Sequence, residues 1–473
     1  MANLLSSLTT AGQALDVYQQ ALEVVQNNLT NSTTPGYAKQ SLNIQALPFD
    51  SASGLAGGVA ARGLDSSRDE YAEEEVRRQT QSLGSYQAQA DGLSQVESLI
   101  DVTGNSGVST SLDSLLQSFS AWSVTPSDSS ARQMVIDNAG SFADTLSGLA
   151  KSMTATSGQI QNQIGSTVTQ INQLAGEVAQ YNDTAVPGTP NPGADANLHS
   201  ALEQLSSLVN ITTLAQADGK VNVLLGGGSP LVLGTTQYQI SAGLGDNTGA
   251  PNPAGPRDST ILDAQGNDIT SQVQGGQLGG YLDVRNNLLA SIVGDGQQTG
   301  SLNVFAKAFA DTVNGILTSG TTAAGSTGQA GVALFQYDAS DPTLAASSFA
   351  VDPAATADLL APVDSSGNAN GNALALASLG DSTASGGVGG TNFDAYYSQM
   401  VAALGQQSSN AQTNQQAQQQ VVTQAQSLRD QASGVSLDDQ AVTLLQFQRS
   451  YQSVSEYLKT VNSMADSLLS ILQ

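Results

Sequence analysis

The chain has 473 residues, of which 39% are hydrophobic, 5% aromatic and 11% charged, and the remainder is rich in Ser, Thr, Gln, Asn and Gly. Its 14 basic and 40 acidic residues give a formal net charge of −26. Binding to nucleic acid or to an anionic membrane needs clustered Lys and Arg, which this sequence lacks, and the absence of Cys excludes disulfides and Cys-based zinc sites. We therefore expect an exported or assembled protein with large wetted surfaces and roughly two to four domains.

The N-terminal residues have the features of neither a secretory signal nor a membrane anchor. The start MANLLSSLTTAGQALD has no basic beginning and no continuous apolar core, and the sequence holds no run of roughly 18 apolar residues. We therefore expect neither a cleaved signal nor a membrane-spanning helix. This expectation points to the cytoplasm, whereas the composition points to an exported protein.

The first 30 residues carry a coiled-coil pattern. Apolar residues recur at alternating intervals of four and three, which predicts a helix with one continuous apolar stripe. This N-terminal seam consists of Leu4, Leu8, Ala11, Leu15, Tyr18, Leu22, Val25 and Leu29. Pro35 disfavours helical backbone at Thr34, and Gly36 permits positive φ, so the helix must end near residues 31–33.

After the end of this first helix, the sequence predicts strands and then further helices. Residues 40–65 are expected to form strands and turns, and helical spacing returns over 69–100. A shorter helix is predicted at 112–122. A long amphipathic helix is predicted to begin at TPSD, with Thr125 as its N-cap, and to reach residue 181.

The second half alternates in the same way. Residues 213–270 and 320–393 are Gly-rich, with short apolar runs. The first is predicted to be a β-rich insert and the second a β-rich or irregular insert, whereas 276–317 should be helical. Ten of the 21 residues from 406 to 426 are Gln. A flexible low-complexity linker is one interpretation of that bias, but no Gly or Pro interrupts the stretch, and we favour a helix.

A second seam occupies the C-terminal end. Intervals of three and four alternate again after a break at Ser433-Gly434, which predicts another coiled-coil helix. This C-terminal seam consists of Leu444, Phe447, Tyr451, Val454, Leu458, Val461, Ala465, Leu468 and Leu472.

The two seams allow two interpretations. They could form an ordinary helical hairpin within one chain, or they could pair with each other and also with neighbouring copies. We favour the second, because the seams lie at the chain ends, which fray unless tied down, and because two lone helices bury little surface.

The sequence offers no convergent catalytic residues. His199 is the only His and is expected on the surface of a helix. In the run Glu73-Glu74-Glu75, Glu73 is expected to pair with Arg77 and Glu74 with Arg78, each four residues on, on a solvated helix face. No phosphate-binding loop, calcium loop or metal-ligand cluster is present in the pattern of residues. We predict no enzyme activity, no cofactor and no metal.

The motif NNLTNSTTPGYAKQ resembles the signature of bacterial flagellar axial proteins, the rod, hook and hook-associated proteins. Its core residues are Asn28, Asn31, Thr34, Pro35, Gly36 and Tyr37. The end of the chain, GVSLDDQAVTLLQFQRSYQSVSEYLKTVNSMADSLLSIL, is similar to the matching end of those proteins. Three further segments resemble the hook-associated protein 1 family in particular: the long helical run from 68 to 181, GGQLGGYLDVRNNLL at 275–289 and GNALALASL at 371–379.

This resemblance implies a mostly α subunit with β-rich inserts, in which terminal coiled-coil helices join a long-helix bundle in an elongated, multi-domain chain. The expected inner domain comprises 1–36 and 440–473. The expected bundle comprises 37–212, with its strand-rich segment near 40–65, together with 271–319 and 394–439. The inserts at 213–270 and 320–393 would form β-rich outer domains.

The resemblance also implies a location and partners. Axial proteins leave the cell through the flagellar type III apparatus with an uncleaved signal, which explains an exported composition without a secretory signal. Copies of the chain would form a ring at the hook–filament junction, bound to the hook protein on one side and to a second junction protein or the filament protein on the other. A cytoplasmic chaperone would hold the C-terminal segment, and the termini would be disordered in the free subunit.

Three alternatives stay open at this point. The chain could be a hook or distal rod subunit of the same axial family. It could be a secreted Gly/Ser-rich adhesin. It could also be an enzyme, such as a peptidoglycan hydrolase, on an axial scaffold, although the middle of the chain shows no convergent carboxylate or metal site.

Overall fold

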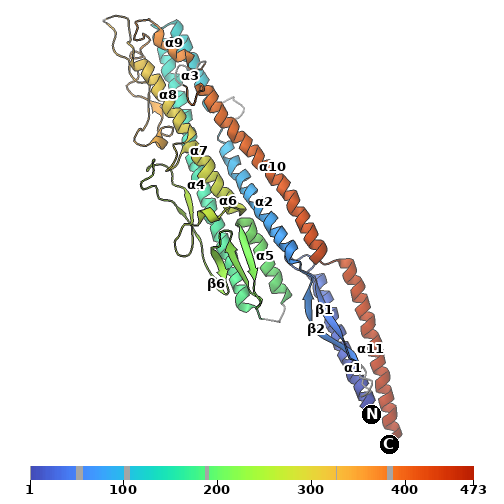
Figure 1. Ribbon diagram of the computed structural model, residues 1–473. Coiled ribbons are helices and arrows are strands. Elements are labelled where there is room, and N and C mark those ends of the chain that lie inside the picture. Colours follow the sequence, from blue (N-terminus) through green and yellow to red (C-terminus); the bar gives the residue numbers. More distant parts are fainter. Residues whose placement is uncertain are drawn as a thin grey trace.

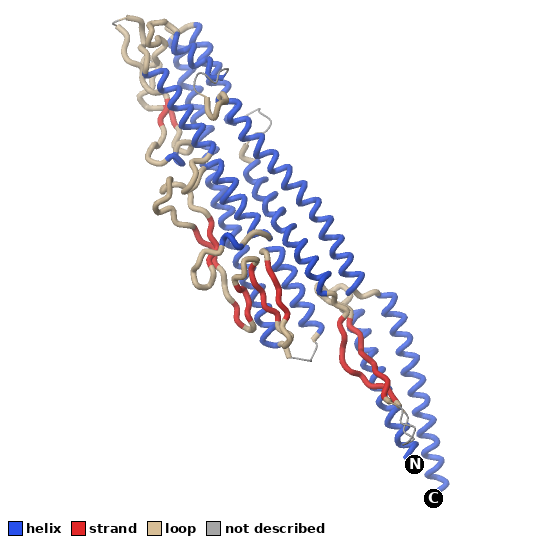
Figure 2. The backbone as a smooth tube through the Cα atoms, viewed as in Figure 1, coloured by secondary structure: helices blue, strands red, loops and turns tan. Residues whose placement is uncertain are grey.

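The computed structural model describes residues 2–48, 57–100, 107–186, 191–325, 327–380 and 387–472. The subunit is elongated, and its two chain ends lie together at one tip (Figure 1). Helices form most of it, and the strands gather in small sheets along one side (Figure 2). The predicted class, mostly α with β inserts in an elongated subunit, is confirmed.

The chain ends form two long helices. α1 spans Ala2–Thr30 and α11 spans Leu437–Leu472. The two helices pack against each other, and the hairpin β1 (Gln40–Leu47) and β2 (Gly58–Ser66) packs against α1. Both terminal segments are therefore helical in this structure, whereas the resemblance implies that they are disordered in the free subunit.

The remaining helices build the bundle. α10 covers the Gln-rich stretch, so the helical interpretation of that stretch is confirmed. The helices are α2 (Glu70–Glu97), α3 (Gly107–Val124), α4 (Ser129–Thr184), α5 (Pro192–Leu208), α6 (Gly276–Asp283), α7 (Ala290–Val293), α8 (Ser301–Thr318), α9 (Gly371–Ala377) and α10 (Phe393–Ser433). Short 3₁₀ turns stand at Thr270–Gln272, Pro342–Leu344 and Ser378–Gly380.

Two predicted helix boundaries are wrong. α4 begins at Ser129 because the carboxylate of Asp128, and not Thr125, accepts from the backbone N–H of Ser130 as its N-cap. The helix expected over 276–317 is interrupted, because Gly294 and Gly300 adopt φ of 86° and 83° between α7 and α8.

The GGQLGGYLDVRNNLL segment packs unusually close to α2. A Cβ atom at Gly280 would lie 2.4 Å from the backbone oxygen of Ser85 on α2. The segment continues as a π-helix from Val284 to Leu289 before α7. Glycines here let α6 approach α2 so closely that a larger residue could not fit without moving a helix.

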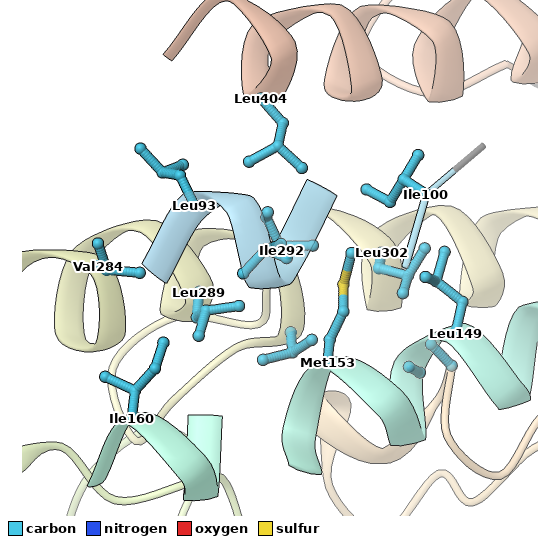
Figure 3. Packing of buried hydrophobic residues seen from close by; sticks show 14 of the residues in the cluster. Leu93, Ile100, Leu149, Met153, Ile160, Val284, Leu289, Ile292, Leu302 and Leu404 are labelled. Carbon is cyan, nitrogen blue, oxygen red and sulfur yellow. The ribbon is translucent and has the colours of Figure 1, made fainter. Parts of the chain in front are cut away.

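One apolar core runs along the bundle. In Figure 3, Leu93 of α2, Met153 of α4, Ile292 of α7 and Leu404 of α10 converge on it. Six of the nine Phe residues form a buried aromatic cluster at the end of the bundle that carries α3 and α8. They are Phe142, Phe305, Phe309, Phe335, Phe349 and Phe393.

Replacing Phe309 by Ala should lower the free energy of unfolding of this end by about 3–5 kcal/mol. Its ring lies 5.0 Å from the rings of both Phe142 and Phe393, and its side chain is fully buried. Chemical denaturation of the purified protein measures the change. Met134→Ala on the exposed surface of α4 is the control, and an equal loss in both variants would contradict the assignment of Phe309 to the core.

The first insert is a true sheet region. β3 (Ile211–Ala215), β4 (Val221–Leu225), β5 (Pro230–Leu233) and β6 (Thr236–Gln237) form an antiparallel sheet in that order. β7 (Ser241–Leu244) pairs with β8 (Ser259–Leu262) beside it.

Of the two alternatives for residues 320–393, the irregular one applies and the β-rich one does not. In the described part of this segment, named strands are limited to β9 (Phe335–Gln336) and β10 (Ala350–Val351), which pair with each other. Turns, isolated bridges and the short α9 fill the rest of the described chain. Its Gly, Ser and Asp residues form local turns instead, as where the Asp364 carboxylate accepts from the N–H groups of Ser366 and Asn368.

Asparagines on the helices attach the inserts to the bundle. Asn172 of α4 donates to the carbonyl of Ile240 and accepts from its N–H, and Asn182 of α4 does the same with Val221. Asn286 pairs in this way with Ser259. Each amide side chain thus takes the place of a neighbouring strand and satisfies both backbone groups of one residue.

Among the helices of the described residues, none is both long enough and apolar enough to cross a membrane.

Candidate assembly site

The two predicted seams face each other in an antiparallel helix pair. The ring centroids of Tyr18 on α1 and Phe447 on α11 are 6.3 Å apart. Val25 and Val461 are buried, and Tyr451 is 37% exposed. The other described seam residues of the predicted site are half-buried: Leu8, Leu15, Leu22, Leu29, Leu444, Val454 and Leu458. The side chains of Leu4, Leu468 and Leu472 lie outside the described residues.

The pair leaves apolar surface exposed on α11. α1 is covered on a second side by the β1–β2 hairpin, and its residues Val17 and Ala21, which lie outside the seam, are buried. α11 has no such cover in the described structure, and Val442, Tyr457 and Met464 are 65%, 51% and 55% exposed. At about 100° per residue these three lie within roughly 60° of one another, away from the seam that faces α1.

Asn28 of the NNLTNSTTPGYAKQ motif connects four parts of the terminal unit, which consists of α1, the turn after it, the β1–β2 hairpin and α11. Its Nδ2 donates to the carbonyl of Gln40 at 2.8 Å and to Oε1 of Gln440 at 3.0 Å. Its Oδ1 accepts from the hydroxyl of Tyr37 and from the N–H of Gln40, each at 2.9 Å. The buried amide thus joins α1, the turn, β1 and α11.

The other motif residues shape the turn. Asn31 makes only local bonds, to the carbonyl of Asn27 and from the hydroxyl of Thr34. Pro35 is exposed, and Gly36 has φ of 73°. A Cβ atom at Gly36 would lie 2.3 Å from the carbonyl oxygen of Ala196, so this turn sits directly against α5.

A buried charged cluster holds the turn to the bundle. Arg68 donates to the carbonyl of Gly36 at 2.7 Å and pairs with Glu73 at 2.6 Å and Asp195 at 2.7 Å. Arg429 of α10 pairs with Glu203 of α5 at 2.7 Å and lies 3.8 Å from Glu73. These ion pairs tie α2, α5 and α10 together where the terminal unit meets the bundle.

The prediction of a solvated Glu-Arg helix face is therefore wrong in part. Glu73 is only 4% exposed and pairs with Arg68 and Arg429 instead of Arg77. Burial raises the pKa of Glu73, and the nearby arginines act against that rise. Arg78 does remain exposed, but it pairs with Glu75, three residues earlier, and not with the expected Glu74.

His199 is also misplaced by the sequence prediction, because it is 93% buried beside this cluster and not on the surface. Burial, together with the positive charges of Arg68, Arg77 and Arg429, lowers its pKa to about 3. The carboxylate of Asp195 lies 3.6 Å from its Nε2, but that carboxylate already pairs with Arg68. The imidazole is therefore neutral over the ordinary pH range.

His199 should make the subunit sensitive to acid. Since its pKa is lower in the folded state than in the unfolded state, the unfolded state binds more protons between about pH 6.5 and pH 3, and stability falls as the pH falls through that window. The loss should be on the order of a few kcal/mol. We expect His199→Gln to flatten the dependence of the unfolding midpoint on pH between 6.5 and 4. A slope equal to that of the unchanged protein would contradict this role.

The α1–α11 pair and the charged cluster beside it provide contacts suited to assembly. Within the described residues, no group of three or more His, Asp or Glu side chains is placed to hold a metal ion. The residues that the sequence reasoning missed are Arg68, Asp195, Gln440 and Arg429. The scarcity of basic residues, 14 in the whole chain, was a signal that each arginine warranted a search for its partner.

Paired terminal helices, an Asn-centred turn and a bundle inserted between the two chain ends define the class of flagellar axial subunits. The comparisons agree: the model of the flagellar basal body rod FlgEFG protein C-terminal region matches residues 429–471. The model of the flagellar hook-associated protein FlgK helical domain matches residues 93–335, just over half of the chain.

Similar proteins narrow the class further. Flagellar hook-associated protein 1 of Bacillus subtilis (strain 168) is 24% identical over 514 residues, covering 99% of this chain and 98% of that protein. The protein of the same name from Salmonella typhimurium (strain LT2) is 25% identical over 568 residues, covering 98% and 100%. The solved structure of the flagellar hook junction protein FlgK from Burkholderia pseudomallei has the same fold, with a TM-score of 0.65 at 16% identity over 75% of this chain and 99% of that one.

The chain belongs to the flagellar hook-associated protein FlgK family. It is a structural flagellar protein of the hook–filament junction.

Proposed function

We propose that this chain is the adaptor on which the filament assembles, and that its copies form a ring through their terminal helices. The observation that carries the proposal is the apolar surface of α11 that α1 leaves uncovered, including Val442, Tyr457 and Met464. Burying this surface against a neighbouring copy removes apolar area from water, which favours association. The seam residues on α1 and α11 hold the pair in the shape that presents it.

The proposed division of the chain follows from this role. The terminal residues 1–36 and 440–473 form the inner unit around the export channel. Residues 37–212, 271–319 and 394–439 form the surrounding helical layer, and 213–270 and 320–393 lie outside it. Packing of the β1–β2 hairpin on α1 supports moving that hairpin from the helical layer to the inner unit.

The proposed partners occupy the two ends of the ring. The hook protein lies on one side, and a second junction protein or the filament protein lies on the other. Head-to-tail contacts do not have to close on themselves, so one subunit type can match two different lattices. The chain reaches this place through the flagellar type III apparatus.

A cytoplasmic chaperone is proposed to cover the C-terminal segment before export. The exposed apolar side chains Val442, Leu445, Tyr457 and Met464 support this, because exposed apolar surface on an unassembled subunit promotes aggregation. Purified protein should therefore be less soluble than a variant in which Val442, Tyr457 and Met464 are replaced by Ser, at equal concentration.

The alternative of a hook or distal rod subunit is separated from this proposal by deleting the gene. Electron microscopy of the cells and measurement of flagellin in the medium are the readouts. We expect bare hooks and released flagellin, since filament subunits would be exported with nothing to polymerise on. Missing hooks would instead indicate a hook or rod subunit, and normal filaments would overturn the flagellar role and favour the adhesin.

A further inference from the structure

Two long helices of the bundle contain stretches without any charged residue. α4 has none from residue 152 to residue 176, and α10 has none from residue 395 to residue 428. At 1.5 Å per residue, the α4 stretch is roughly 37 Å long and the α10 stretch roughly 50 Å. Such neutral stretches stand out in a chain of net charge −26.

Each neutral stretch has an exposed face. On α4 the face repeats at helical intervals, and its exposed residues include Ala155, Asn162, Ser166, Thr169 and Gln173. On α10 the exposed residues include Thr413, Gln416, Gln420, Gln424 and Ser427. The opposite sides of both helices are buried in the bundle, so these faces point outward.

The two faces lie at the same level but on different sides of the bundle. α4 and α10 run in the same direction (Figure 1), and Met153 of α4 and Leu404 of α10 enter the same stretch of the core (Figure 3). Near the C-terminal ends of the two helices, Tyr181 of α4 and Arg68 line the same cleft. Arg429 of α10 lies close to Glu73, which pairs with Arg68, so these ends of α4 and α10 are also at the same level. α10 packs on α2, α2 packs on α6, and α6 packs on α4, which places α2 and α6 between the two faces.

We infer that the neutral face of α10 in one copy packs against the neutral face of α4 in the next copy. This inference rests on the proposed ring and names the contact that holds its helical layer together. Copies that each carry a charge of −26 repel one another, and these are faces that can approach without opposing like charges. Hydroxyl and amide side chains offer both donors and acceptors to the neighbour.

The geometry fits a head-to-tail contact between neighbouring copies. Because the two faces are different, each copy offers α10 on one side and α4 on the other. Most exposed side chains on the two faces are polar and stay hydrated on the free subunit. At the edge of the α10 face, Val421 and Leu428 are 40% and 57% exposed, and the contact would bury them.

Engineered cysteines test this contact cleanly, because the natural chain has none. The double variant Ser166→Cys with Gln416→Cys is expressed in cells that lack the native gene, and isolated flagella are oxidised and separated without reductant. We expect a ladder of disulfide-linked copies. Either substitution alone should give at least several-fold less linked material, because each cysteine then faces an unmodified residue.

The matched control is Ser120→Cys with Gln416→Cys, since Ser120 is exposed on α3, outside the proposed contact. Assembled flagella with no ladder in the double variant would overturn the inference while leaving the junction role intact. Strong linking by Gln416→Cys alone would also overturn it, because that result needs two α10 helices facing each other. Absence of even the unmodified protein from the isolated flagella would instead reject the proposed function.

A charge exchange provides a second readout that does not need oxidation. Gln416→Glu should reduce incorporation several-fold by adding an unpaired charge to the contact, and adding Ser166→Lys should restore it. Full incorporation of Gln416→Glu alone, or no restoration by Ser166→Lys, would overturn the inference.

Discussion

Cells that carry Leu458→Asp or Leu15→Asp should lose filaments almost completely, while the variant proteins keep a folded bundle. Both side chains are half-buried in the α1–α11 pair. A carboxylate there costs on the order of a few kcal/mol, because it must be desolvated without a partner or must separate the helices. The bundle core does not depend on this pair, since it has its own buried cluster from Ala90 to Ala411. Complementation of a deletion strain, scored by electron microscopy, measures the effect.

Leu15→Met and Leu458→Met are the matched controls, because they keep an apolar side chain of similar volume. They should restore filaments to nearly the level of the unchanged gene. Circular dichroism and thermal unfolding of the purified Asp variants test the bundle. Loss of the bundle fold in either Asp variant would contradict the assignment of these residues to a separate inner unit.

Asn28→Ala should be the most damaging substitution in the Asn-rich motif. It removes all the hydrogen bonds that the amide makes to Gln40, Tyr37 and Gln440. Each buried polar group left without a partner costs about 1–3 kcal/mol. We expect faster amide hydrogen exchange in α1 and in the β1–β2 hairpin, together with a large loss of filament-bearing cells.

Asn31→Ala is the control for this prediction, because Asn31 makes only local bonds within the turn. Its effect on exchange and on filaments should be small. Equal effects of the two substitutions would show that the motif acts through the turn conformation alone and not through the contacts of Asn28.

The charged cluster explains how the inner unit is held to the bundle. Three of the 14 basic residues, Arg68, Arg77 and Arg429, lie in or beside it. Arg68 is the direct connection, because it bonds both the turn at Gly36 and the bundle carboxylates of Glu73 and Asp195. A clamp of this kind fixes the direction in which the terminal helices leave the bundle.

Sequence patterns alone predicted the two terminal helices and the end of the first, and the resemblance of the motifs pointed to the family. Heptad spacing over residues 4–29 and 444–472 indicated the two terminal helices, and Pro35 with Gly36 indicated the end of the first. These features are readable because helix periodicity and backbone restriction act between residues that are near each other in the chain.

The polar residues that hold the subunit together could not be predicted, because their partners lie far away in the chain. Arg68 meets Asp195 across 127 positions, and Asn28 meets Gln440 across 412. Glu73 pairs with Arg68 and Arg429 and not with Arg77, the partner expected four residues on. The reason is that packing of α2, α5 and α10 buries the Glu73 carboxylate beside those two arginines. The neutral stretches of α4 and α10 were visible in the sequence. That they form two outward faces at one level was set by how the helices pack around α2 and α6.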